Sequence, residues 1–251
     1  MNEWLSYRPS DFLMFAPRTY WRLFELHNGA WWPAQPLLVL AGLGWMGWLL
    51  RGGSPALRAG APALAAALSF VAVTFMLDRY AAVNWAASGF ALGFMAQALG
   101  LAALATRVDW GTVSPGPRRR IGLTIFAWAL LGHPLLALAF DRPWTQAEVF
   151  GLAPDPTAIA TLGFLLCAHT QRRLTRWLLR SLWTLATAWC AISSATLWTM
   201  GSAQAWVLMG VTLAALAAAW LLPYGPAASR HAPARAAVAG AGESANPRRP
   251  P

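Results

Sequence analysis

The chain has 251 residues, of which 57% are hydrophobic and 11% are charged. Soluble domains carry about 25% charged residues, so this composition excludes an ordinary soluble enzyme and indicates a membrane protein. Nineteen basic residues, all arginine, oppose nine acidic residues and give a net charge of +10. The absence of lysine excludes Schiff-base chemistry, including that of a retinal protein.

Residues 1–32 precede the first long apolar segment and predict helices that lie in the membrane interface on the outer side. Ser10 is expected to cap a first turn, and Pro17 to begin a second helix that runs to His27. No uninterrupted apolar stretch typical of a cleavable signal peptide occurs in this region.

Seven apolar segments follow, at residues 33–50, 61–77, 86–106, 121–140, 156–170, 181–200 and 203–223. A helix needs about 20 residues to cross about 30 Å of hydrocarbon, and its backbone groups must be bonded within the segment. The fold class is therefore predicted as all-α: an integral membrane bundle of about seven transmembrane helices over residues 33–223. Segment 156–170 is short, so we expect it to continue into the following leucines or to thin the bilayer locally. Residues 224–251 are predicted to be a disordered basic tail.

The arginines predict the orientation of the bundle. Seven crossings would place fourteen arginines and two acids on the side of the C-terminus, and five arginines and seven acids on the side of the N-terminus. We therefore expect the N-terminus outside and the C-terminus in the cytoplasm of a bacterial inner membrane. On the cytoplasmic side, two groups are predicted to bind anionic lipid headgroups: Arg118, Arg119 and Arg120, and Arg172, Arg176 and Arg180. These roles account for most of the excess charge without nucleic-acid binding.

Polar and aromatic residues gather in the predicted outer segments. Their mixture predicts a recessed site for a small polar or zwitterionic ligand, lined by Arg18, Arg22, Glu25, Asp78, Arg79, Tyr80, Asn84, Trp85, Glu148 and Asp155. The alternative is that these groups pair with one another and fix the outer loops on the bundle, with Trp and Tyr in the interfacial belt. Asp155 is also expected to cap the helix of segment 156–170.

His133 is the one ionisable side chain near the middle of a predicted span. Such groups mark functional sites by default, which predicts a ligand or proton role. Pro134 follows it and would kink the helix, so the alternative is a neutral imidazole that hydrogen-bonds locally.

Motifs of catalytic and cofactor sites are missing. The histidines His27, His133 and His169 are predicted at unmatched depths, which argues against a haem with two histidine ligands. No zinc, phosphate-loop, dinucleotide or serine-hydrolase motif occurs. Cys167 and Cys190 lie in apolar segments and are expected to be buried thiols. We expect no cofactor, no metal site and no catalytic activity.

Gly89 and Gly93 have the spacing of a close helix contact, either within the bundle or between subunits. Gln97 on the same segment is expected to find a partner inside the bundle.

Three stretches carry a resemblance to a known family: 10–25, 79–87 and 142–157, the last reading RPW…EVFGLAPDPT. They resemble an uncharacterised bacterial family of polytopic inner-membrane proteins, a domain of unknown function that is sometimes labelled permease. The resemblance extends over most of residues 1–223 and implies a membrane fold without an activity. The sequence thus predicts a transporter-like or ligand-binding membrane protein with an outward-facing polar site. The alternative is a non-catalytic scaffold or accessory subunit that binds a partner membrane protein or a second copy of the chain.

Overall fold

The computed structural model describes residues 15–113 and 115–222. Ser10 and the rest of the predicted first turn, and the basic tail from residue 223, lie outside the described residues. The described helices are α1 (Pro17–Ala30), α2 (Ala34–Gly52), α3 (Ser54–Phe70), η3 (Val71–Leu77), η4 (Tyr80–Ala82), α4 (Ala87–Ala105), α5 (Pro117–Ala127), η5 (Trp128–Gly132), α6 (His133–Ala139), η6 (Trp144–Gln146), α7 (Pro154–Cys167), α8 (Arg173–Thr199) and α9 (Gln204–Leu221). Two short strands, β1 (Trp110–Thr112) and β2 (Ala168–Thr170), pair antiparallel.

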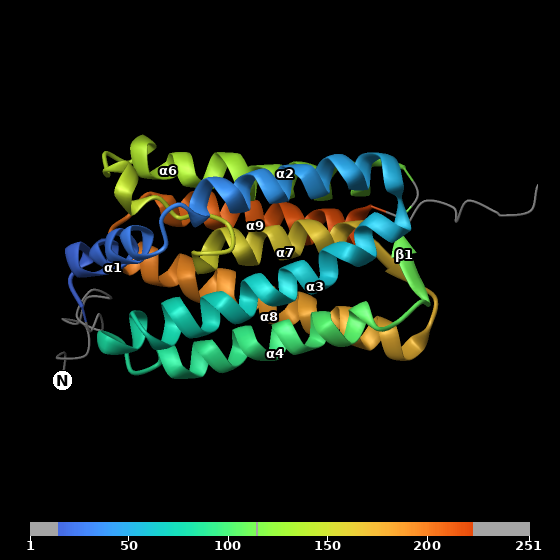
Figure 1. Cartoon of the computed structure of the whole chain (residues 1–251), viewed down its shortest axis with the longest axis horizontal. Coiled ribbons are helices and arrows are strands. Elements are labelled where there is room, and N and C mark those ends of the chain that lie inside the picture. Colours follow the sequence, from blue (N-terminus) through green and yellow to red (C-terminus); the bar gives the residue numbers. More distant parts are fainter. Residues whose placement is uncertain (1–14, 114, 223–251) are drawn as a thin grey trace, which may run out of the picture.

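The long helices run side by side along one axis (Figure 1). The short connections collect at two ends. One end holds α1, η4, η6 and the α8–α9 turn, and the other holds the α2–α3 turn and the β1–β2 pair. We call these the outer end and the inner end, after the sides that the sequence predicts for them.

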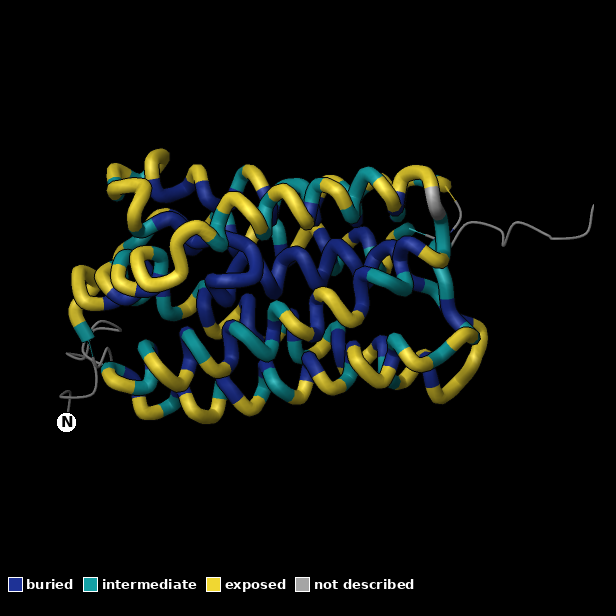
Figure 2. Tube along the Cα trace, in the orientation of Figure 1, coloured by how far each residue is buried: buried dark blue, intermediate teal, exposed yellow. Residues whose placement is uncertain are grey.

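Helix α7 forms the centre of the bundle. All fourteen of its residues are buried, and it packs against α3, α5, α8 and α9. Figure 2 shows this buried central layer between helices with exposed outer faces. Gly122 of α5 and Gly163 of α7 make the closest approach, because a Cβ at either position would lie 2.7 Å from the carbonyl oxygen of the other.

Each of the seven predicted apolar segments is helical over most of its length, which confirms the all-helical fold. Four helical stretches are long and apolar enough to cross a membrane by themselves, namely Ser54–Ala82, Ala87–Ala105, Pro117–Ala139 and Gln204–Leu221. The pair α1 and α2 passes the same test together but is bent by 84°. The count of seven crossings therefore remains a prediction.

One of the two alternatives predicted for segment 156–170 is wrong, and the other, local thinning of the bilayer, stays a prediction. α7 does not continue into the following leucines; it ends at Cys167, where β2 begins. Because other helices surround α7, it needs no contact with lipid along its length. On its outer side, residues 147–153 form an irregular buried segment. Such backbone is tolerated at membrane depth only where protein or a cavity surrounds it.

Local predictions in this region also need correction. The expected cap by Asp155 is not formed, because the N-cap of α7 is Ala153, without a side-chain cap hydrogen bond. Asp155 lies in the first turn instead. A Cβ added at Gly89 or Gly93 would meet nothing within 4 Å among the described residues, so this face of α4 does not pack within the bundle. Gln97 is buried and donates to the carbonyl of Leu182, as expected.

Candidate functional site

The predicted outer residues do not form one pocket. Arg18, Arg22, Asp78 and Trp85 are exposed, whereas Tyr80 and Asn84 are buried. Tyr80 stands in an aromatic cluster, with its ring centroid 5.8 Å from that of Tyr20. Arg79 is half-buried. Arg22 binds Glu25 on the same helix, and this hydrogen bond lowers the pKa of Glu25. Arg18, Arg22 and Glu25 line a cleft of about 570 Å³ at the outer end, but none of the other predicted lining residues borders it.

The structure instead brings Glu148 and Asp155 together with His133 inside the outer end of the bundle. Several elements contribute to this outer cluster, which we define as His133, Arg142, Glu148, Asp155 and Gln204. His133 begins α6, Arg142 and Glu148 belong to the connection to α7, and Asp155 and Gln204 lie in the first turns of α7 and α9. His133, Glu148, Asp155 and Gln204 are at most 1% exposed.

Glu148 is the member of the cluster with the most polar neighbours. Its Oε2 accepts a hydrogen bond from Gln204 Nε2 and lies 3.7 Å from both His133 Nε2 and Arg142 Nη2. Burial opposes the charged form, but His133, Arg142 and Gln204 outweigh it and hold the pKa of Glu148 below its ordinary value. The other oxygen, Oε1, is buried and has no hydrogen-bond partner among the described residues.

Asp155 is held by α8. Trp189 Nε1 donates to Oδ1 at 2.8 Å, and Ser193 Oγ donates to Oδ2 at 2.7 Å. The carboxylate also sits at the N-terminus of α7, where backbone N–H groups favour negative charge. Both effects fix its orientation toward the cluster.

The local backbone at His133 is unusual. The π-helical turn η5 ends at Gly132, and Pro134 follows His133 directly. Insertions of this kind occur often at functional sites, because they re-aim a side chain within a helix. Neither ring nitrogen of His133 has a hydrogen-bond partner among the described residues. The alternative prediction, a neutral His133 imidazole that forms a local hydrogen bond, is therefore not met among the described residues.

Arg142 closes the cluster on its outer side. Its guanidinium lies 3.5 Å from the centroid of the Trp21 ring and donates to Gln204 Oε1. Helix α1 also holds the same connection through Asn28, whose side-chain amide donates to the carbonyls of Thr145 and Ala147. The predicted interfacial helix is thus part of the wall around the cluster.

The formal charges of the cluster do not balance. Glu148 and Asp155 supply two carboxylates, and Arg142 supplies one guanidinium. With both carboxylates ionised and a neutral imidazole, the sum is one negative charge in a buried volume. An uncompensated buried charge is costly, so the cluster favours the uptake of a proton or of another cation.

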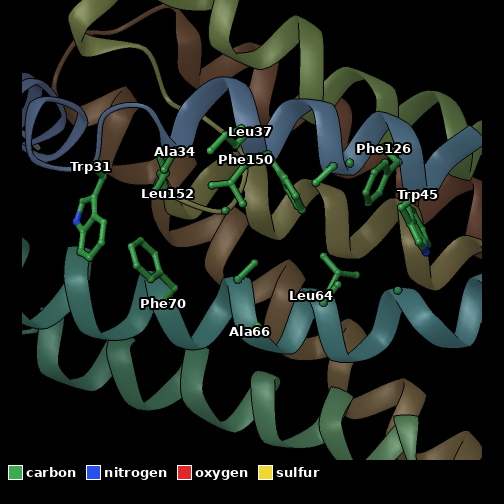
Figure 3. Close-up of a pocket in the computed structure, with 17 residues that line it drawn as sticks. Trp31, Ala34, Leu37, Trp45, Leu64, Ala66, Phe70, Phe126, Phe150 and Leu152 are labelled. Atoms are coloured by element: carbon green, nitrogen blue, oxygen red, sulfur yellow. The ribbon is translucent and has the colours of Figure 1, made fainter.

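An apolar cleft of about 600 Å³ lies beside the cluster, between α2 and α3. Figure 3 shows Trp31 and Phe70 at one end, Trp45 and Phe126 toward the other, and Phe150 and Leu152 along one wall. The segment 147–153 therefore separates an apolar space on one side from the carboxylate of Glu148 on the other.

The arginines of the inner end have different partners. Arg118 is buried and donates to the carbonyls of Ala219 and Leu222 at the end of α9, so the prediction that it binds headgroups is wrong. Arg119 donates to the carbonyl of Leu49, and Arg58 to those of Val108 and Trp110. Arg120, Arg172, Arg176 and Arg180 are exposed and stay predicted headgroup contacts.

Sequence reasoning missed four contributors to the site. Arg142 lies in the connection before α7, Trp189 and Ser193 lie on α8, and Gln204 begins α9, 56 residues from Glu148. The buried polarity of Gln204 at the start of an apolar helix was the one signal that could have drawn attention to it.

The described chain is therefore an all-helical protein with several helices able to cross a membrane and a charged cluster buried at one end. Its sequence matches the model of the family of unknown function DUF6064 over residues 18–224, and the chain belongs to that family. No curated protein and no solved structure matches it.

Proposed function

We propose that this chain is a multi-pass protein of the bacterial inner membrane that binds a small cationic ligand in the outer cluster. The bundle has seven membrane helices, with the N-terminus outside and the C-terminus in the cytoplasm. The observation that carries the proposal is the burial of two carboxyl groups, those of Glu148 and Asp155, with a single guanidinium, that of Arg142.

The architecture around the cluster supports a transporter-like role. Many transporters bind their substrates where membrane helices are interrupted, with the N-terminus of a half-helix facing the site. Here the fourteen-residue helix α7 begins at the cluster and is preceded by irregular buried backbone. The aromatic ring of Trp21 lies over Arg142 and covers the cluster toward the outside through a cation–π contact.

Topology tests the membrane part of the proposal. Thr145 and Gln171 are exposed at opposite ends of the bundle. With Cys167 and Cys190 replaced by alanine, Thr145→Cys is expected to react with an impermeant reagent on intact cells, and Gln171→Cys only after permeabilisation. Labelling of both positions from the same side would contradict the arrangement.

Thermal unfolding in lipid nanodiscs tests the ligand part. Sodium, ammonium, small alkylamines and divalent cations are added separately to the wild type, to Asp155→Asn and to the control Asp141→Asn. Asp141 lies exposed in the connection before α7, so its substitution removes one negative charge outside the cluster. A ligand at one hundred times its Kd stabilises the folded state by about 2.7 kcal/mol. We expect one cation to raise the melting temperature of the wild type and of Asp141→Asn, but not of Asp155→Asn. If every cation acts equally on all three proteins, the proposal fails.

A second candidate, a membrane subunit that binds a partner protein, is favoured by the exposed outer residues. Trp85 is 81% exposed, and Asp78 and Arg18 are exposed at the same end. Replacement of Trp85 by alanine would then abolish association while leaving the cation response intact.

A further inference from the structure

We propose that His133, Glu148 and Asp155 form a binding site for a divalent transition-metal ion. This proposal rests on the proposed function and names the class of the cation. The three residues each offer one ligand atom, and these atoms all lie within 4.8 Å of one another.

The spacing of the ligand atoms is close to that of a bound ion. Ligands about 2.1 Å from a tetrahedral zinc ion lie about 3.4 Å apart. His133 Nε2 and Glu148 Oε2 are already 3.7 Å apart. The third ligand, Asp155, offers a carboxylate oxygen within 4.8 Å of the other two ligand atoms.

The unsatisfied atoms are the ones that a metal ion needs. Both nitrogens of His133 and Oε1 of Glu148 are buried and lack hydrogen-bond partners among the described residues. An ion beside Oε2, which lies 3.7 Å from His133 Nε2, can thus take Oε1 as a second ligand atom of the same carboxylate while Gln204 keeps its hydrogen bond to Oε2. A buried polar atom without a partner costs about 1–3 kcal/mol, and coordination removes that cost.

The surroundings resemble the outer shell of a metal site. Ligating carboxylates are typically fixed by hydrogen bonds from neighbouring groups. Asp155 receives such bonds from Trp189 and Ser193, and Glu148 from Gln204.

The ligand set favours one class of metal. One imidazole and two carboxylates suit divalent ions from manganese to zinc. The imidazole disfavours magnesium and calcium, which prefer oxygen ligands alone, and the set contains no sulfur ligand that would favour a softer metal. Three protein ligands leave a coordination position open. A divalent ion with one anionic ligand at that position brings the formal charge of the cluster to zero.

Binding of zinc chloride to the full chain tests the proposal. The protein is stripped with a chelator in lipid nanodiscs and loaded with zinc, and the bound metal is counted by mass spectrometry. Affinities come from calorimetry, and cobalt(II) replaces zinc to give an absorption spectrum that reports the ligands. We expect one zinc per chain and a cobalt spectrum that zinc abolishes.

Variants locate the site. His133→Gln and Asp155→Asn are expected to weaken zinc binding at least about 100-fold, and Trp189→Phe about 10-fold through the lost hydrogen bond to Asp155. His169→Gln removes an imidazole at the inner end, Asp141→Asn removes an exposed acid, and both are expected to bind zinc as the wild type does. Circular dichroism and gel filtration confirm that each variant is folded.

The proposal is overturned if the folded wild type binds no stoichiometric zinc, manganese or cobalt, or if folded His133→Gln and Asp155→Asn bind zinc as tightly as the wild type. If a monovalent cation then still stabilises the wild type and not Asp155→Asn, the proposed function stands without the metal. If no cation does so, both proposals fail.

Discussion

The two ends of the bundle use buried charge in opposite ways. At the inner end, Arg118 and Arg119 donate to carbonyls at the ends of other helices, which lack partners within their own helices. At the outer end, Arg142 meets a carboxylate, and a second carboxylate remains without a cation. The first arrangement is satisfied by the chain itself and stabilises the fold. The second is incomplete without a further positive charge, which is why we assign function to it.

Arg118→Met is expected to have the largest effect on stability. The substitution keeps the apolar stem but removes the donor to Ala219 and Leu222. Hydrogen bonds from a charged group contribute about 1.5–3 kcal/mol each, so we expect a loss of about 4 kcal/mol in the free energy of unfolding. The cation response of the outer cluster should be unchanged in the folded fraction. If Arg118→Met is as stable as the wild type but no longer responds to cations, the inner end serves ligand binding rather than stability, which contradicts the comparison.

The packing between the two ends is tested by Gly163→Ala. The added Cβ would lie 2.7 Å from the carbonyl oxygen of Gly122 and 2.8 Å from the backbone nitrogen of Phe126. Backbone atoms cannot move away cheaply, so we expect a loss of about 3 kcal/mol, measured as a lower melting temperature in nanodiscs. Gly93→Ala is the matched control, because no described residue would lie within 4 Å of the added Cβ. Alanine there should stabilise the helix by up to about 1 kcal/mol. Equal effects at both positions would show that the centre is not packed as described.

The glycines of α4, α5 and α7 also show what the sequence can and cannot predict. The spacing of Gly89 and Gly93 predicted a close contact within the bundle or between subunits. Among the described residues α4 turns that face outward, and the close approach within the bundle is made at Gly122 and Gly163. A spacing of small residues shows that a helix can be approached closely, not which face its neighbours cover. Which face of a helix points into the bundle depends on contacts between segments that are far apart in the chain.

The helices themselves were predictable because the length of each apolar segment and the charged residues or prolines at its ends can be read from the local sequence. Segment 203–223 coincides closely with α9, and 86–106 with α4. The π-helical turn before His133 was not predictable, since it leaves the apolar pattern unchanged. Glu148, Asp155 and His133 were each predicted as site residues, but their meeting depends on the path of residues 147–153, for which no periodic pattern exists.

Gly151→Ala tests the segment that carries Glu148. Gly151 has φ of +79°, and a Cβ would lie 3.2 Å from the side chain of Leu38. We expect a loss of about 1–2 kcal/mol in stability, because this backbone conformation is unfavourable for alanine. We also expect weaker cation binding, because Glu148 would be displaced. If Gly151→Ala is destabilised but binds the cation as tightly as the wild type, the conformation of segment 147–153 does not determine the site.

Asp155→Asn is expected to have the smallest effect on the free energy of unfolding, and to raise it rather than lower it. Asparagine keeps an acceptor for Trp189 and can donate to Ser193, while it removes the surplus charge. Neutralising such a charge is neutral or stabilising, here by about 1 kcal/mol in the absence of a cation. Thermal unfolding of the chelator-treated protein measures this change. A clear loss of stability would indicate that the outer cluster, like the inner arginines, serves only the fold.

The most direct test compares thermal unfolding of the wild type and Asp155→Asn in nanodiscs, first after chelation and then with saturating zinc chloride. The account predicts a crossover: the variant melts at or above the temperature of the wild type without zinc, and clearly below it with zinc. A variant that melts below the wild type by the same margin in both conditions would contradict the central claim that the outer end is built to receive a cation.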